Sequence, residues 1–381
     1  MASIRKRSWT NPRGIEQTAW QVDYRDAAGH RRSKQFARKK DAEAWTTQAA
    51  WHVSQGTHTP DSQSITIEKA AELWLERARR EELEPTTIAA YDQHVRLHIL
   101  SLCGARKLSH VTRPMVEGWR DELVKKLSRP MARRVLRSLS SLIGEAQRRG
   151  YAAQNVAAGV TVGKLARSKP KPAIPTKAQM RAIIEAALES ERPMDAALVL
   201  TQIFGGLRAS ELRGLSWPQI NLKAKTLTVD RRADAKNRIG PPKSAAGFRL
   251  IPLPGMVVAE LRKWKLQCPK TDLGLVFPSE RKAVLSHTSL HRLHLNPVQE
   301  AAKLSQTYSS HAFRHCAASL WIEQRLSPKR IQTWMGHSSI QVTFDTYGHL
   351  FEQAEADSAI MQAVEREVLG VADATPMQQG A

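Results

Sequence analysis

The part of the chain that decides its fold reads SHAFRH at residues 310–315, WMGH at 334–337 and TFDTYGHL at 343–350. His311 and Arg314 are three residues apart, so on a helix they share one face. His337 follows a glycine that is expected to end a short helix, and Tyr347 comes ten residues later. A single His-x-x-Arg or Tyr-x-His pattern is weak by itself, so these segments gain meaning only from the rest of the domain.

Two segments upstream carry further cations: TQIFGGLRASELRGLSW at 201–217 and PPKSAAGFRLIPL at 241–253. In the first, Gly205 and Gly206 are predicted to end an apolar helix, and a chain reversal would then present Arg208 inward. Glu211 is expected to lie in the helix that restarts there. In the second, Lys243 is expected at the tip of a turn that leads into a strand. Taken alone, both cations would be ordinary surface residues.

Taken together and in this order, the segments resemble the signature of the tyrosine recombinases, the phage integrase family. The resemblance is close over about residues 176–350 and rests on these motifs: Gly-Leu-Arg208-x-x-Glu211-Leu, Lys243 before a strand, His311-x-x-Arg314-His315, Gly336-His337 and Tyr347-x-His-Leu. It implies a multidomain, mainly α-helical protein whose catalytic domain is mixed α with a small antiparallel sheet. It also implies a site-specific recombinase that integrates or excises a phage or another mobile genetic element.

The resemblance implies that Tyr347 attacks the DNA phosphate. A phosphodiester under attack gathers negative charge on its non-bridging oxygens, and the fixed charge and forked donors of Arg208 and Arg314 suit that charge. The phenol of tyrosine has an ordinary pKa of about 10, so it needs help to lose its proton. By resemblance, His311 would assist that transfer.

The same resemblance gives the other residues of the site their roles. Lys243 would protonate the departing 5′-oxygen, and His337 would add a donor to the phosphate. Glu211 would orient its neighbours, and Trp334 would pack. The product would be a covalent 3′-phosphotyrosine, which keeps the bond energy, so that no cofactor and no metal is expected. The sequence has no phosphate-binding Gly-rich loop with Lys-Ser/Thr, and its histidine spacings match no common zinc pattern.

The catalytic segment opens with a capping box at Thr176 and Gln179, and it contains short predicted strands at 226–229 and 247–253. Before it, residues 64–160 show four helical stripes and are predicted to form a helical core-binding (SAM-like) domain. The stripes are Ile67, Ala71, Trp74 and Ala78; Ile88, Tyr91, Val95 and Ile99; Val116, Trp119 and Leu123; and Val135, Leu139, Leu142 and Ala146.

Residues 1–58 are predicted to form a small sheet-plus-helix module similar to the arm-type DNA-binding domains of phage integrases. Strand alternation at 20–25, a turn at 26–29 and a returning strand at 31–36 precede a helix that carries Ala42, Trp45, Ala49 and Val53.

Two segments flank the catalytic domain. Residues 163–175 form a basic, Pro-rich linker that is either a solvated spacer or a strap along DNA phosphates. Residues 351–381 form an acidic tail in which Ile360, Val364 and Val368 suggest an amphipathic helix. That helix could dock on a neighbouring protomer or fold back on its own chain.

The composition agrees with a DNA-binding partner. Lys and Arg total 58 against 36 Asp and Glu, a net charge of +22 over 381 residues, and 41% of the residues are hydrophobic. Such an excess favours a polyanion such as nucleic acid, although a ribosome-associated or simply basic protein is an alternative. The three cysteines are far apart, and no apolar run is long enough to span a membrane. A cytoplasmic, nucleoid-associated protein encoded by a bacterium or phage is expected.

The expected partners are double-stranded DNA attachment sites, a homotetramer on synapsed DNA, and a DNA-bending or directionality factor. Two other functions remain open at this point. A repressor or a decayed integrase would bind DNA without cutting it, although the complete set of catalytic residue types disfavours decay. A relaxing topoisomerase would share the chemistry without site-specific synapsis, and the two N-terminal modules disfavour it.

Overall fold

The computed structural model describes residues 2–26, 29–55, 58–163 and 173–351. Two compact units divide the chain, Met1–Ser168 and Lys169–Ala381, and each is described by itself. Most of the predicted linker (164–172) and the predicted tail helix (within 352–381) lie outside the described residues. None of the helices among the described residues combines the length and the apolar character needed to cross a membrane.

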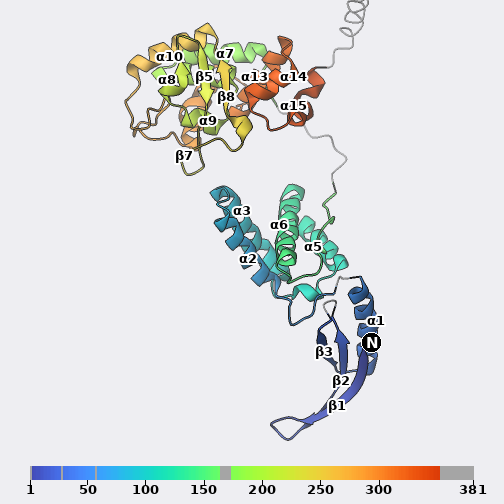
Figure 1. Cartoon of the computed structure of the whole chain (residues 1–381). Coiled ribbons are helices and arrows are strands. Elements are labelled where there is room, and N and C mark those ends of the chain that lie inside the picture. The colour runs from blue at the N-terminus through green and yellow to red at the C-terminus, as the bar shows by residue number, and fades with distance from the viewer. Residues whose placement is uncertain (1, 27–28, 56–57, 164–172, 352–381) are drawn as a thin grey trace, which may run out of the picture. The chain divides into compact units, whose positions relative to one another are not determined.

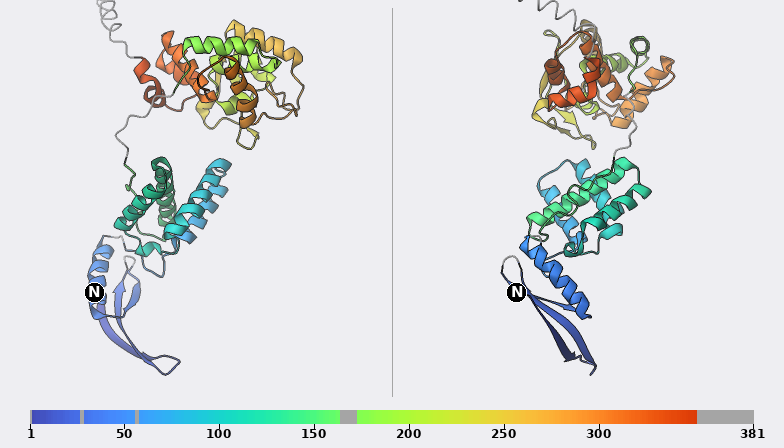
Figure 2. Two further views of the ribbon diagram at one scale, coloured as in Figure 1. Left: turned by 180° about the vertical axis from the view of Figure 1, so that it is seen from behind. Right: turned by 90° about the vertical axis from the view of Figure 1, so that its right-hand side faces the viewer.

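The N-terminal part of the first unit is a three-stranded antiparallel sheet with one helix packed on it (Figures 1 and 2). Its elements are β1 (Ser3–Thr10), β2 (Glu16–Arg25), β3 (Arg31–Phe36) and α1 (Lys39–Ser54). The predicted strands at 20–25 and 31–36 and the helix after them are confirmed. The edge strand β1 was not predicted, because it is exposed along almost its whole length and has no apolar alternation. Paired polar side chains fix its register: Arg5 contacts Asp23 at 3.0 Å, and Arg7 donates to Gln21 at 3.0 Å.

The rest of the first unit is a helical bundle, as predicted. It consists of α2 (Ile67–Arg80), α3 (Pro85–His94) continued by η1 (Val95–Ile99) and α4 (Leu100–Cys103), η2 (Leu108–His110), α5 (Arg113–Lys126) and α6 (Arg129–Arg148). The apolar stripes read from the sequence meet in one core, in which Ile67, Val116 and Leu142 are fully buried. The long helices α2 and α6 pack against each other, and Trp74 of α2 donates to Ser141 of α6 at 3.1 Å.

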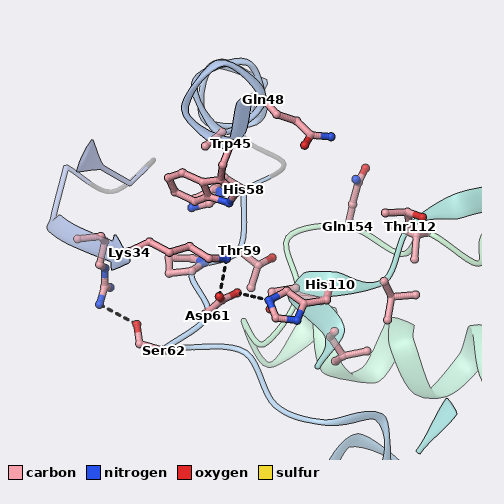
Figure 3. A pocket seen from close by; sticks show the side chains of 18 of the residues that line it. Lys34, Trp45, Gln48, His58, Thr59, Asp61, Ser62, His110, Thr112 and Gln154 are labelled. Atoms are coloured by element: carbon pink, nitrogen blue, oxygen red, sulfur yellow. Dashed lines mark hydrogen bonds and ion pairs between the residues drawn. The ribbon is translucent and has the colours of Figure 1, made fainter. Parts of the chain in front are cut away.

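A short segment around Asp61 joins the sheet module to the bundle and lines a pocket of about 840 Å³ between them (Figure 3). The carboxylate of Asp61 accepts a hydrogen bond from Lys34 Nζ of β3 at 2.8 Å and lies 3.1 Å from His110 Nε2. The backbone carbonyl of Asp61 accepts a further hydrogen bond from Lys107 Nζ at 2.9 Å. Burial alone would raise the pKa of Asp61, but the hydrogen bonds from Lys34, Ser109 and His110 lower it to about 2. Asp61 therefore stays charged and ties the two parts of this unit together.

The second unit is mainly helical around a central helix, α8 (Pro193–Gly205), which is buried on almost every side. The flanking helices are α7 (Lys177–Leu188), α10 (Gly255–Gln267) and α13 (Ser310–Glu323), all of which contact α8 (Figure 1). A small antiparallel sheet has the order β4 (Ile220–Asn221), β5 (Thr226–Val229) and β8 (Arg249–Pro252), and a second hairpin pairs β6 (Arg232–Ala233) with β7 (Ile239–Gly240). The predicted capping box at Thr176 and the predicted strands are confirmed.

The remaining elements complete the second unit. They are α9 (Ala209–Gly214), η3 (Trp217–Gln219), η4 (Ala245–Gly247), α11 (His287–Ser289), η5 (Leu290–Leu295), α12 (Asn296–Ala301), α14 (Pro328–Met335), α15 (Ile340–Tyr347) and η6 (Gly348–Leu350). Helices α13, α14 and α15 lie together at one end of the unit (Figure 1), packed around Ile331, Met335 and Tyr347. The fold class predicted from the sequence, mainly α with small antiparallel sheets, is confirmed.

Candidate active site

The turn after α8 places Arg208 at the start of α9. Gly206 ends α8 in the left-handed conformation with φ of +57°, and a Cβ atom there would come 2.8 Å from the Trp321 ring, so only glycine fits. The backbone N–H of Arg208 donates to Glu211 at 2.8 Å, which caps α9. Its guanidinium donates to Glu211 at 2.8 Å and to the carbonyl of Gly336 at 3.0 Å. The chain reversal predicted from the sequence is present, and it directs the partly exposed side chain of Arg208 toward the end of α14.

Arg314 comes from the first turns of α13 and is the largest fully buried side chain in the described structure. It donates to the carbonyl of Gly206 at 2.6 Å and to the carbonyl of Met335. Burial and the charge of Arg208 lower the pKa of Arg314 to about 9, so it remains protonated at neutral pH.

A third arginine, Arg249 of β8, contacts the same end of α14 as Arg208 and Arg314. No motif in the sequence had indicated it. Its Nε donates to the carbonyl of Trp334 at 2.7 Å. Three consecutive carbonyls at the C-terminal end of α14 therefore each accept from a different guanidinium: Trp334 from Arg249, Met335 from Arg314, and Gly336 from Arg208. The C-terminal carbonyls of a helix lack intrahelical donors and carry its negative partial charge, so they suit this role.

Glu211 is the anion among these three arginines, and its side chain is only 3% exposed. Both of its oxygens accept from Arg249, at 3.1 and 2.8 Å, and Arg314 lies 4.0 Å away. Burial by itself would raise the pKa of Glu211, but the Arg249 hydrogen bonds and the charges of the three arginines lower it to about 2. Three cations and one anion leave two positive charges uncompensated, which is an environment suited to a phosphodiester.

Tyr347, at the end of α15, is buried, and its hydroxyl lies 2.7 Å from Nδ1 of His315. Burial raises the pKa of Tyr347, so the phenol is protonated at neutral pH. Burial, with the charges of His311 and Arg314, lowers the pKa of His315 to about 4. A neutral His315 can therefore accept the phenolic proton in this hydrogen bond.

The partner of Tyr347 is thus His315, whereas the sequence analysis assigned proton transfer to His311. The side chain of His311 is exposed, and its ring centroid lies 4.5 Å from that of His315. Partial desolvation by the surrounding protein, with the charges of Arg314 and Arg208, lowers the pKa of His311. The four-residue spacing of the two histidines on α13 was the available signal, because it places both on one helix face.

His337 follows the left-handed Gly336, as predicted, and its Nδ1 lies 2.9 Å from the hydroxyl of Thr343. Burial and the nearby arginines lower the pKa of His337 to about 4, so it is neutral. The Trp334 ring packs edge-to-face on Trp321 at 5.1 Å. Both residues belong to the same end of α14 that holds the arginines.

Lys243 differs from the other predicted residues because it is exposed, on the loop between β7 and β8. That loop is folded tightly on itself, since a Cβ atom on Gly247 would come 2.4 Å from Cβ of Pro242. The structure therefore brings Arg208, Glu211, Arg314, Trp334 and His337 together beside Tyr347, and it places Lys243 on a compact loop attached to this cluster.

Residues 175–354 match the family model described as the phage integrase family. Most of the chain is similar to curated tyrosine recombinases. One is a XerC-like tyrosine recombinase of Caldanaerobacter subterraneus subsp. tengcongensis, 24% identical over 88% of this chain and 92% of the relative. Another is the tyrosine recombinase XerC of Mesorhizobium japonicum, 28% identical over 73% of this chain and 89% of the relative.

Two solved structures of integrases bound to DNA share the fold of this chain. The Tn1549 transposon integrase, in complex with a circular intermediate DNA, has a TM-score of 0.66 at 19% identity and covers 79% of this chain and 100% of its own. A lambda integrase tetramer bound to a Holliday junction has a TM-score of 0.57 at 19% identity, over 87% of this chain and 95% of its own. The family match and the curated relatives together identify residues 175–354 as a domain of the phage integrase family, and the chain as a tyrosine-type site-specific recombinase.

Proposed function

We propose that this recombinase cuts and rejoins DNA through Tyr347, with the arginine cluster at the end of α14 as its phosphate-binding site. The observation that carries the proposal is the convergence of Arg208, Arg249 and Arg314 on adjacent carbonyls, with Glu211 leaving this arginine cluster two positive charges. In cleavage, a bond forms between Tyr347 Oη and phosphorus as the bond from phosphorus to O5′ breaks. The product is a 3′-phosphotyrosine and a free 5′-hydroxyl, and the reverse reaction with another strand's 5′-hydroxyl rejoins the DNA.

The chain's own residues divide this work. Arg208 and Arg314 hold the non-bridging oxygens, on which negative charge grows during attack. His337, neutral in this environment, donates to the phosphate. Lys243 gives its proton to the departing O5′, a transfer that typically accelerates such a step by about 10²–10⁴-fold.

The phenolic proton leaves through the two histidines of α13. His315 accepts the hydrogen bond from Tyr347 in the free protein. His311 lies next to it and is exposed to solvent, so we assign it the onward transfer of the proton. Glu211 orients the arginines, and Trp334 packs beside them.

The substrate that we propose is a pair of double-stranded attachment sites of a phage or another mobile element. Support comes from the net charge of +22 and from the cationic strand β1, whose Arg5, Lys6 and Arg7 are exposed. We propose that residues 1–58 bind arm-type DNA, that residues 64–160 bind core DNA, and that residues 176–350 carry out catalysis. A relative of this chain is the prophage integrase IntR of Escherichia coli K12, which is 23% identical over 74% of the chain.

Synapsis requires several protomers. A tetramer on a Holliday junction is the assembly of the lambda integrase structure, and we propose the same assembly here. A DNA-bending or directionality factor would choose between integration and excision. The reaction would take place on the bacterial chromosome, in the cytoplasm at the nucleoid.

A suicide substrate tests the proposal. Duplexes that bind the full chain are selected from random DNA and then nicked near the cleavage position, so that the released fragment diffuses away and the covalent adduct accumulates. We expect a protein–DNA adduct that survives denaturation, and the variant Tyr347→Phe should bind the same duplex but form no adduct. Binding without any adduct would leave a DNA-binding protein that does not cut. Relaxation of arbitrary plasmids without recombination would indicate a topoisomerase.

A further inference from the structure

Arg249 has contacts with three separate parts of the active site, although its role is not implied by the catalytic motifs. Its side chain is 1% exposed. It donates to Glu211 through two nitrogens, to the carbonyl of Trp334 at 2.7 Å, and to the carbonyl of Gly247 at 3.0 Å. Because a guanidinium is planar and its donors are fixed, these contacts hold the three partners in one geometry.

The contact with Gly247 connects this guanidinium to the loop that carries Lys243. Gly247 packs directly on Pro242, the neighbour of Lys243, and its N–H donates to Ser244 at 2.9 Å. The same loop also touches the end of α14, since a Cβ atom on Gly336 would come 2.9 Å from the carbonyl oxygen of Ala246. The position of Lys243 is therefore set by its loop, and the loop is held against the phosphate-binding cluster from one side by Arg249.

We propose that Arg249 is a positioning residue, which places the Lys243 loop relative to Arg208 and Arg314 so that Lys243 reaches the leaving oxygen. This inference rests on the proposed function. It assigns Arg249 no contact with DNA. Its effect is exerted at one step, the transfer of a proton from Lys243 Nζ to O5′ as the bond from phosphorus to O5′ breaks.

A substrate with sulfur in place of the bridging O5′ isolates that step. A thiolate is a much weaker base than an alkoxide, so the bond from phosphorus to S5′ breaks without a proton from Lys243. A variant that misplaces Lys243 should therefore be slow on the oxygen substrate and nearly normal on the sulfur substrate. A variant that weakens phosphate binding should be slow on both.

Two variants test the inference by single-turnover cleavage of the two suicide substrates. Arg249→Lys keeps a charge beside Glu211 but cannot reach all three partners. Gly247→Ala displaces the loop at Pro242 and leaves the Arg249 side chain unchanged. For both we expect cleavage about 10–100-fold slower on the oxygen substrate, a partial loss of the roughly 10²–10⁴-fold that general-acid catalysis supplies, and within about threefold of wild type on the sulfur substrate.

Three further variants serve as references. Lys243→Ala should show the same rescue by sulfur, and Arg208→Lys should be slow on both substrates. Asp195→Asn weakens a buried pair with His294 that touches none of the active-site residues, so it controls for a general loss of stability. Any slowing of cleavage by Asp195→Asn should be equal on the oxygen and the sulfur substrates.

The outcomes separate the two proposals. Equal slowing of Arg249→Lys on both substrates, or no slowing on either, overturns the positioning role. If Arg249→Lys does not fold, Gly247→Ala decides by the same criteria. Absence of sulfur rescue in Lys243→Ala, or of any adduct with wild type, would instead overturn the proposed function, and the role of Arg249 with it.

Discussion

The hydroxyl of Tyr347 and Nδ1 of His315 lie 2.7 Å apart in the free protein, and both side chains are buried. The pKa of the histidine is lowered while that of the tyrosine is raised, so both groups are neutral at physiological pH. The proposed nucleophile, Tyr347, is therefore held by a hydrogen bond to His315 before DNA arrives. This pair and the arginine cluster beside it lead to the following predictions.

The free energy of unfolding should depend on pH through the buried His315. The pKa of His315 falls from 6.5 to about 4 on folding, so the unfolded chain takes up the proton first as the pH drops. The contribution of this neutral histidine to the free energy of unfolding is complete above pH 6.5 and decreases below it, by about 2 kcal/mol at pH 5. Urea unfolding at pH 7 and pH 5 should show a smaller loss of stability in His315→Gln than in wild type. An identical loss in both proteins would contradict the lowered pKa.

Removing the anion of the arginine cluster should destabilise the catalytic unit strongly. Glu211→Gln leaves Arg249 and Arg314 buried with less compensation, and breaking a buried ion pair in this way typically costs about 3–5 kcal/mol. The free energy of unfolding, measured in urea, gives the value directly. The control Glu185→Gln, on the exposed side of α7, should change it by less than about 0.5 kcal/mol. A loss of under 1 kcal/mol in Glu211→Gln would contradict the described ion-pair network.

The glycine at the end of α14 should not tolerate a side chain. Gly336 has φ of +62°, and a Cβ atom there would come 2.9 Å from both the Ala246 oxygen and Arg249 Nη1. Gly336→Ala should therefore lower the free energy of unfolding by about 1–3 kcal/mol. It should also slow cleavage, because it shifts the carbonyls that hold the arginines. Gly255→Ala is the matched control, since its Cβ atom would meet nothing within 4 Å. Equal stability of the two variants would argue against this packing.

The ion pairs of Asp61 should hold the sheet module against the helical bundle. Asp61→Asn removes the charge that pairs with Lys34 and His110, so the segment between the two parts should become more accessible. Limited proteolysis should cut this segment several-fold faster than in wild type, and Glu122→Gln, an exposed carboxylate on α5, should not change the rate. Because the pKa of Asp61 is about 2, wild type should keep its resistance at pH 5. Unchanged cleavage of Asp61→Asn would show that other contacts suffice.

Local signals in the sequence predicted most of the fold. The left-handed glycines at 206 and 336, the capping box at Thr176 and the apolar stripes of the bundle depend on neighbours within a few residues. Strand β1 could not be predicted in this way, because its cationic side chains pair with β2 across the sheet and leave no alternating pattern.

The motifs named the candidate site residues, but the contacts between them were not predictable. Arg249 donates hydrogen bonds to Glu211, which is 38 residues away in the sequence, and to the carbonyl of Trp334, which is 85 residues away. No periodicity links positions so far apart, and a buried arginine on a short strand has the same sequence pattern as an exposed one. His315 was visible in its motif, but only the packing of α15 against α13 makes it the partner of Tyr347.

The three arginines of the cluster reach main-chain oxygens at the end of α14 and not side chains. Apart from the glycine required at 336, such a contact does not involve the side chain at each position, but it depends on the number of residues between them. Apolar substitutions at Met335, which is buried beside Ile331, should therefore matter only through the volume of that side chain. The insertion or deletion of one residue between Ile331 and His337 would move every oxygen out of reach of its guanidinium at once. For this part of the enzyme, chain length is a stricter requirement than composition.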